Sequence, residues 1–121
     1  MLNRYVVHHH KTGRSHYDLR LVQEEVLRCW SLLREPPQKN GEQRLAIERE
    51  SFDTQAIDSS KFEEEVFGVG NVYIWDRGVV DTAHASARCL ILDFQGARLS
   101  GRYELKRMHW YPGNRWLLKK V

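Results

Sequence analysis

Cysteine and long apolar runs are both scarce in this sequence of 121 residues. Its two cysteines, Cys29 and Cys89, each lie in a short apolar run, which is typical of buried free thiols rather than of a disulfide scaffold. No apolar run approaches the roughly 20 residues that a membrane-spanning helix needs. The first ten residues also lack the apolar core of a signal peptide. We therefore expect a soluble, cytoplasmic protein that does not enter a membrane.

A large excess of charge of one sign is also absent. Lysine and arginine number 19 and aspartate and glutamate 16, so the formal net charge is +3 with neutral histidine. This balance is compatible with a polyanionic partner but does not require one. The hydrophobic fraction of 41% supports one packed core, and a chain of this length hardly holds two. We expect a single domain over residues 1–121 and a monomer.

The sequence has no amphipathic helix of ordinary length, and its dominant hydrophobic period is two. We expect turns at residues 24–25, 77–78 and 95–97, a long loop at 34–43, and a short helical turn at 58–66. The pattern predicts an all-β fold, a small antiparallel barrel of about eight strands with one or two short helical turns, or else a sandwich. The expected strands are residues 4–9, 16–22, 26–33, 44–50, 71–76, 88–94, 98–108 and 115–120.

Residues 8–21, HHHKTGRSHYDLRL, concentrate imidazole and charged side chains. On a strand, His16, Asp18 and Arg20 project from one face, roughly 7 Å apart. His8 and His10 share a face of the preceding strand, and a short glycine-containing connection allows the two strands to pair as a hairpin. His10 would then lie beside His16 and Asp18. Two imidazoles and one carboxylate suit Mn, Fe or Zn, and Arg20 offers a fork for a phosphate or carboxylate.

Two other interpretations of this segment stay open. The polar residues could form only a solvated strand face. A site of two histidines and one carboxylate is also typical of iron oxygenases, in which the second histidine usually lies far downstream. His84 and His109 are the downstream candidates here.

The segment YVVHHHKTGRSHYDLRL resembles the signature of the 3′-phosphoesterase domain of bacterial DNA ligase D and its stand-alone relatives. That signature runs roughly F-V-[VI]-Q-x-H, five residues, then H-Y-D-[FL]-R-L-E. Further similarities follow in order along nearly the whole chain. VLRCWSLLREPP is similar to L-K-S-W-x-x-P-K-G-P, RLAIE to an L-A-V strand, and VFGVGNVYIWDRG to Y-G-x-G-x-V-x-x-W-D-x-G, before the closing segments RLSGRYELKRM and RWLLKK.

The resemblance implies a metal-dependent hydrolase that removes 3′-terminal phosphates or ribonucleotides at DNA breaks, in DNA repair. By position, His10, His16 and Asp18 would be the metal ligands, and with Arg20 they would form the catalytic set. Arg20 would hold the scissile phosphate, with His8 beside it in place of the family's glutamine. The implied metal is Mn²⁺, with Zn²⁺ or another transition metal as the alternative. The implied partners are nucleic-acid 3′ ends, in DNA or DNA/RNA junctions, and an end-joining ligase or polymerase.

The sequence departs from the family where the family completes its phosphate site. Phe52 replaces a histidine of that site, and Ala56 falls at a tyrosine. A phenyl ring neither donates a hydrogen bond nor transfers a proton, so the alternative function is a weakened or inactive relative that binds metal, nucleic-acid ends or a repair partner. His84 is a candidate substitute for the missing proton donor.

Residues 106–120, KRMHWYPGNRWLLKK, interleave basic and aromatic side chains. Such a segment can contact a DNA backbone or stack on an unpaired base. The alternative is a hairpin in which Trp110 and Trp116 belong to the core and the lysines are solvated.

Overall fold

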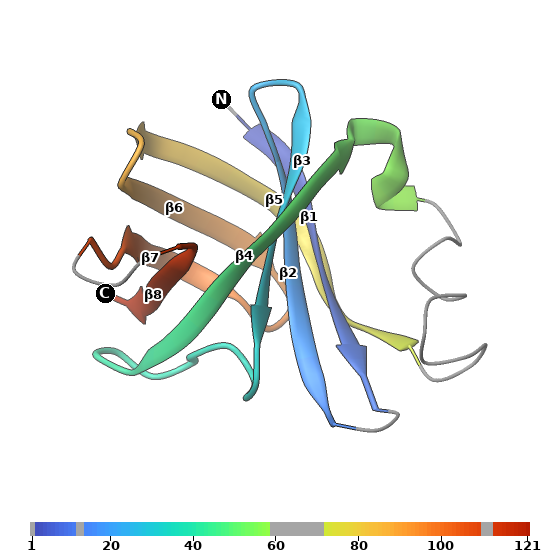
Figure 1. The fold of residues 1–121 in the computed structure, drawn as a ribbon, viewed down its shortest axis with the longest axis horizontal. Helices are drawn as coiled ribbons and strands as arrows, with labels where there is room; N and C mark the ends of the chain where they lie inside the picture. Colours follow the sequence, from blue (N-terminus) through green and yellow to red (C-terminus); the bar gives the residue numbers. More distant parts are fainter. Residues whose placement is uncertain (1, 12–13, 59–71, 110–112) are drawn as a thin grey trace.

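The computed structural model describes residues 2–11, 14–58, 72–109 and 113–121. Eight strands close into an antiparallel barrel in the order β1-β2-β3-β4-β8-β7-β6-β5 (Figure 1). This confirms the predicted all-β class. The elements are β1 (Leu2–His10), β2 (His16–Gln23), β3 (Val26–Leu32), β4 (Gln43–Asp53), the 3₁₀ turn η1 (Thr54–Asp58), β5 (Val72–Ala85), β6 (Cys89–Gly96), β7 (Ser100–Arg107) and β8 (Arg115–Lys120).

The barrel interior is filled by alternate residues of the strands, as the period of two predicts. Large side chains dominate it, and Trp30 and Trp116 pack edge to face with ring centroids 5.7 Å apart. Trp116 is therefore a core residue, as the second interpretation of the C-terminal segment expected. Trp110 lies outside the described residues.

A second, smaller hydrophobic cluster lies on the outer side of the barrel wall, against η1. Figure 1 shows η1 beyond the end of β4, outside the barrel. We call this set the outer cluster. It comprises Val6, Leu27, Cys29 and Ile57, with Val22, Phe52 and Ala56 packed against them.

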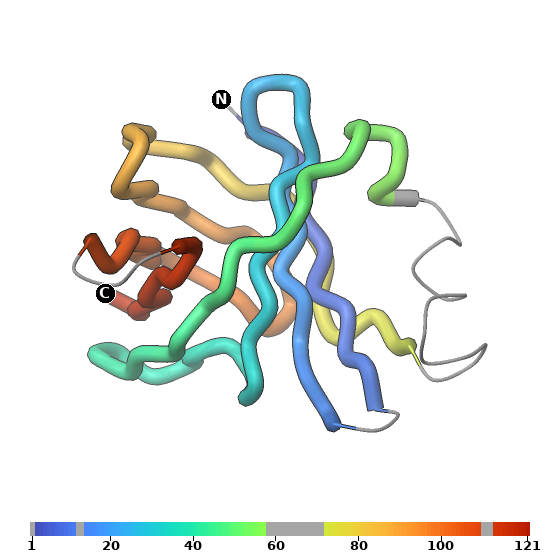
Figure 2. The backbone as a smooth tube through the Cα atoms, in the orientation of Figure 1, coloured from blue at the N-terminus to red at the C-terminus, as the bar shows by residue number. Residues whose placement is uncertain are grey.

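Strand β4 links the two sides of the barrel. Its residues 43–47 pair with β8, and its residues 47–53 pair with β3. Figure 2 shows the strand crossing the barrel diagonally between these neighbours. The strand continues past residue 50, where the sequence pattern weakens, and so carries Phe52 to the outer cluster.

The predicted turn at residues 77–78 is wrong, because β5 continues through Arg77 and Gly78. Gly78 serves a close approach between strands instead: a Cβ there would collide with the backbone carbonyl oxygen of Gln95 on β6. The helical turn expected at residues 58–66 falls almost wholly outside the described residues. Within the described ranges, no helix is long and apolar enough to cross a membrane.

Candidate metal centre

The β1–β2 hairpin brings together the polar side chains of the segment 8–21. In its register His10 lies opposite His16, and His8 lies opposite Asp18. Since alternate residues of the two strands, Val7 and Leu19, point into the core, these polar side chains lie on the outer face of the barrel wall. The hairpin predicted from the short connection is confirmed.

Three potential ligands converge on this face. The Nε2 atom of His10 lies 2.7 Å from Oδ2 of Asp18, and Nε2 of His16 lies 3.5 Å from the same oxygen. The two imidazole rings stack with centroids 4.5 Å apart. One ligand atom from each residue lies within 4.8 Å of the others. Donors around a tetrahedral ion with bonds of about 2.0–2.2 Å stand roughly 3.3–3.6 Å apart, so this group could hold a divalent transition metal after small side-chain adjustments.

Arg20 lies directly beside the three potential ligands and is almost fully buried. Its guanidinium donates to Oδ2 of Asp18, to Nδ1 of His8 and to the sulfur of Cys29, each at 3.2 Å. Contacts on three sides fix the plane of the guanidinium. A fixed, planar fork of N–H donors is suited to binding a phosphoryl group.

The charges at the site follow from burial and from Arg20. Burial alone would raise the pKa of Asp18, but hydrogen bonds from His10 and Ser31, together with the charge of Arg20, lower that pKa to about 2. Burial and the neighbouring Arg20 lower the pKa of His8 to about 4. At neutral pH, Asp18 is therefore an anion suited to a cation, and His8 is neutral and can accept the hydrogen bond from Arg20.

Strand β3 adds two residues that the sequence prediction missed. Ser31 lies opposite Asp18 and donates a 2.6 Å hydrogen bond to its Oδ1, while Cys29 lies opposite Arg20. The signal was present, because a two-residue turn at residues 24–25 fixes this register. Arg49 of β4 extends the chain of contacts by donating to Ser31 Oγ at 3.2 Å.

His84 and His109 do not join this group among the described residues. On β5, Val72 pairs with His10, whereas Asp81 pairs with Leu2 at the other end of β1. Eight residues of strand span about 26 Å, and His84 lies beyond Asp81. The prediction that His84 substitutes for the missing proton donor is therefore wrong. The second imidazole of the group is His10, six residues upstream of His16, so the oxygenase interpretation loses its downstream ligand.

Phe52 and Ala56 both pack in the outer cluster, whose member Cys29 contacts Arg20. Phe52 and Ala56 therefore contribute apolar surface to the cluster that includes Cys29.

The comparisons with known proteins identify the family to which the chain is similar. Residues 8–107 match the model of the DNA ligase D 3′-phosphoesterase domain. The chain is 33% identical to the multifunctional non-homologous end joining protein LigD of Mycobacterium bovis over 98% of its own length, and 32% identical to that of Pseudomonas aeruginosa over 99%. It covers only 16% and 15% of those two proteins. The chain therefore belongs to the family of the DNA ligase D 3′-phosphoesterase domain.

Proposed function

We propose that this chain hydrolyses the phosphate or ribonucleotide at the 3′ end of a broken DNA strand, with a divalent metal, Mn²⁺ foremost. The observation that carries the proposal is the convergence of His10, His16 and Asp18 beside the fixed guanidinium of Arg20. Family membership supplies the reaction class, since the family model describes a 3′-phosphoesterase.

The residues have separable roles in this proposal. His10, His16 and Asp18 would hold the metal, which when bound supplies a water of lowered pKa and charge neutralisation at the phosphorus. Arg20 would bind phosphoryl oxygens and stabilise the negative charge that grows in the transition state. The attacking water oxygen bonds to phosphorus as the bond to the 3′ oxygen breaks, and that oxygen takes up a proton. Ser31 would keep Asp18 oriented.

The second candidate function is a relative that binds metal and 3′ ends with little turnover. The outer cluster around Phe52 supports it, because the described side chains of that cluster are apolar apart from the Cys29 thiol. Both candidate functions require binding of metal and of 3′ ends, but only the first requires efficient hydrolysis.

The setting is part of the proposal. The curated relatives are named multifunctional non-homologous end joining proteins, and this chain spans about one sixth of their length. We propose that residues 1–121 act as one monomeric domain on DNA ends, in the cytoplasm, alone or beside an end-joining ligase or polymerase.

The experiment is release of phosphate from a DNA primer that ends in a 3′-phosphate, with and without Mn²⁺. Wild type is compared with Arg20→Ala, and binding to a 3′-phosphate end is measured beside binding to a 3′-hydroxyl end. Metal-dependent release that Arg20→Ala abolishes supports the hydrolase, and binding without release supports the second candidate. Equal loss of binding to both ends in Arg20→Ala would show that Arg20 does not contact the terminal phosphate.

A further inference from the structure

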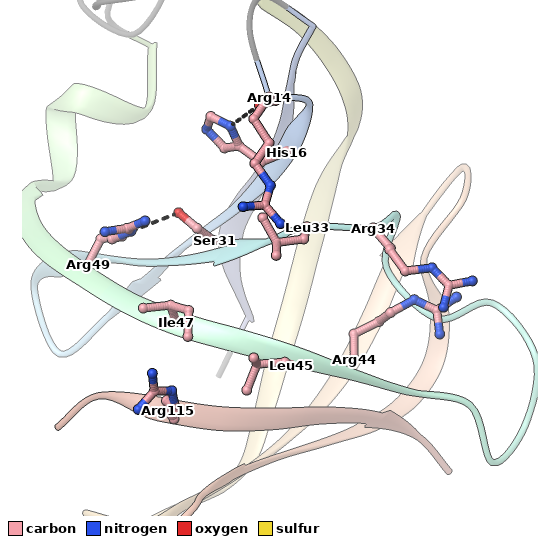
Figure 3. Close-up of a pocket in the computed structure, with 10 residues that line it drawn as sticks. All are labelled: Arg14, His16, Ser31, Leu33, Arg34, Arg44, Leu45, Ile47, Arg49 and Arg115. Carbon is pink, nitrogen blue, oxygen red and sulfur yellow. Dashed lines mark hydrogen bonds between the residues drawn. The ribbon is translucent and has the colours of Figure 1, made fainter. Parts of the chain in front are cut away.

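A groove of about 610 Å³ adjoins the metal centre on the outer side of β3, β4 and β8 (Figure 3). It shares His16 and Ser31 with the centre. Half of its ten lining residues are arginines, and none carries a carboxylate. The arginines are Arg14, Arg34, Arg44, Arg49 and Arg115.

The arginines stand at the edges of the groove, and apolar side chains lie between them. Figure 3 shows Arg49 and Ser31 at one side and Arg34 with Arg44 at the other. Leu33, Leu45 and Ile47 occupy the space between. Leu33 is 54% exposed and Leu45 43% exposed, so this apolar floor is open to a ligand.

We propose that this arginine groove binds unpaired nucleotides of the strand whose 3′ end enters the metal centre. The inference rests on the proposed function, which places a 3′ end at His16. Guanidinium groups bind phosphate oxygens in a fork and stack on the faces of bases. The exposed Leu33 and Leu45 can contact sugars and unstacked bases.

The apolar floor favours a single strand over an intact duplex. A duplex presents phosphates to a protein surface and keeps its bases stacked inside, so it would engage the arginines and leave the floor uncovered. A flexible single strand can place phosphates on the rim and bases on Leu33 and Leu45 together.

Two hydrogen bonds also connect the groove to the metal centre. Arg49 donates to Ser31 Oγ, and Ser31 donates to Asp18 at 2.6 Å. A strand that occupies the groove therefore lies against residues that orient a metal ligand. The groove thus reaches the metal centre, where a 3′ end would lie. This favours the reacting strand as the ligand of the groove over an acidic peptide, because binding of a peptide would not require the groove to reach His16.

The test measures binding of a single-stranded oligonucleotide with a 3′-hydroxyl end, in a chelator, over a series of salt concentrations. The groove pair Arg34→Gln with Arg115→Gln is compared with the control pair Arg88→Gln with Arg102→Gln. All four arginines are exposed, and the control pair lies outside the groove.

If each groove arginine contacts one phosphate, the slope of log affinity against log salt becomes shallower by about 1.4 in the groove pair, since each single-strand contact contributes about 0.7. The control pair keeps the wild-type slope. Leu33→Ser weakens binding and leaves the slope unchanged, because the lost contact is apolar. DNA and RNA oligonucleotides are run in parallel to identify the strand that binds better.

An unchanged slope in the groove pair, an equal change in the control pair, or no binding by wild type would overturn the inference. So would a larger loss on blunt duplex than on single strand, or tighter binding of a glutamate-rich peptide than of the oligonucleotide. Because this readout needs neither metal nor turnover, it is independent of phosphate release from a nucleoside 3′-monophosphate, which tests the metal centre alone.

Discussion

Arg20 donates a hydrogen bond from Nε to Nδ1 of His8 over 3.2 Å, between neighbouring strands β2 and β1. The bond requires a neutral His8, and burial together with the charge of Arg20 lowers the pKa of that imidazole to about 4. His8 thus helps to hold the guanidinium of Arg20 in place.

This hydrogen bond predicts that phosphate release depends on the presence of a hydrogen-bond acceptor at position 8 and not on the imidazole ring itself. His8→Gln keeps an acceptor and should retain phosphate release, whereas His8→Leu should lower kcat/KM about 2- to 13-fold, the loss expected for one hydrogen bond of about 0.5–1.5 kcal/mol. Steady-state kinetics on a 3′-phosphate primer measure both variants. A His8→Leu enzyme as fast as wild type would show that Asp18 and Cys29 suffice to fix Arg20.

The second prediction concerns the metal ligands. His16→Ala should lower Mn²⁺ or Zn²⁺ affinity at least about tenfold, because a direct ligand is lost. His9→Ala is the matched control, since His9 points to the other face, where it stacks on Tyr17 with centroids 4.0 Å apart. Calorimetric titration measures both affinities. Equal metal binding by wild type and His16→Ala would remove His16 from the centre.

The third prediction concerns Ser31, which donates to Oδ1 of Asp18. Partners that orient a metal ligand typically contribute about 10–100-fold in affinity or activity. Ser31→Ala should therefore weaken metal binding by about that factor, and Ser31→Thr, which keeps a hydroxyl, should restore most of it. Similar affinities in the alanine and threonine variants would contradict an orienting role for the hydroxyl group.

The sequence predicted the placement of the candidate ligands well, because strand register alone determines it. The period of two and the short connection place His10, His16 and Asp18 on one face, and the structure confirms it. Prediction from the sequence failed where the residue type alone does not determine the structural role or the position of the residue. Gly78 indicated a turn, but it permits close packing of β5 on β6. His84 has suitable chemistry, and only the pairing of β5 with β1 shows that it lies at the far end of the strand.

The β2–β3 turn gives a fourth prediction, on stability. Glu24 and Glu25 have φ of +50° and +66°, a left-handed conformation that costs non-glycine residues about 1–2 kcal/mol each. The double variant Glu24→Asn, Glu25→Gly should stabilise the protein by about 1 kcal/mol and raise Tm by roughly 3–5 °C. Glu24→Gln with Glu25→Gln removes the same charges and keeps the strain. A rise in Tm of similar size in that control would assign the effect to charge repulsion.

The last prediction concerns Phe52, which the resemblance aligns with a histidine of the phosphate site and which packs in the outer cluster. Loss of one donor to a developing oxyanion typically costs about 10²–10³ in rate. Wild type should therefore bind metal normally but release phosphate slowly. Phe52→His should raise the rate by up to that factor, because Phe52 packs in the cluster that holds Cys29, and the sulfur of Cys29 accepts a hydrogen bond from Arg20. The assay follows phosphate release from a 3′-phosphate primer with Mn²⁺, and Phe52→Leu serves as the control that keeps the cluster apolar. Fast turnover by wild type would show that another group already donates the proton. His84 would not be that donor, since it lies beyond the position of β5 that pairs with the far end of β1.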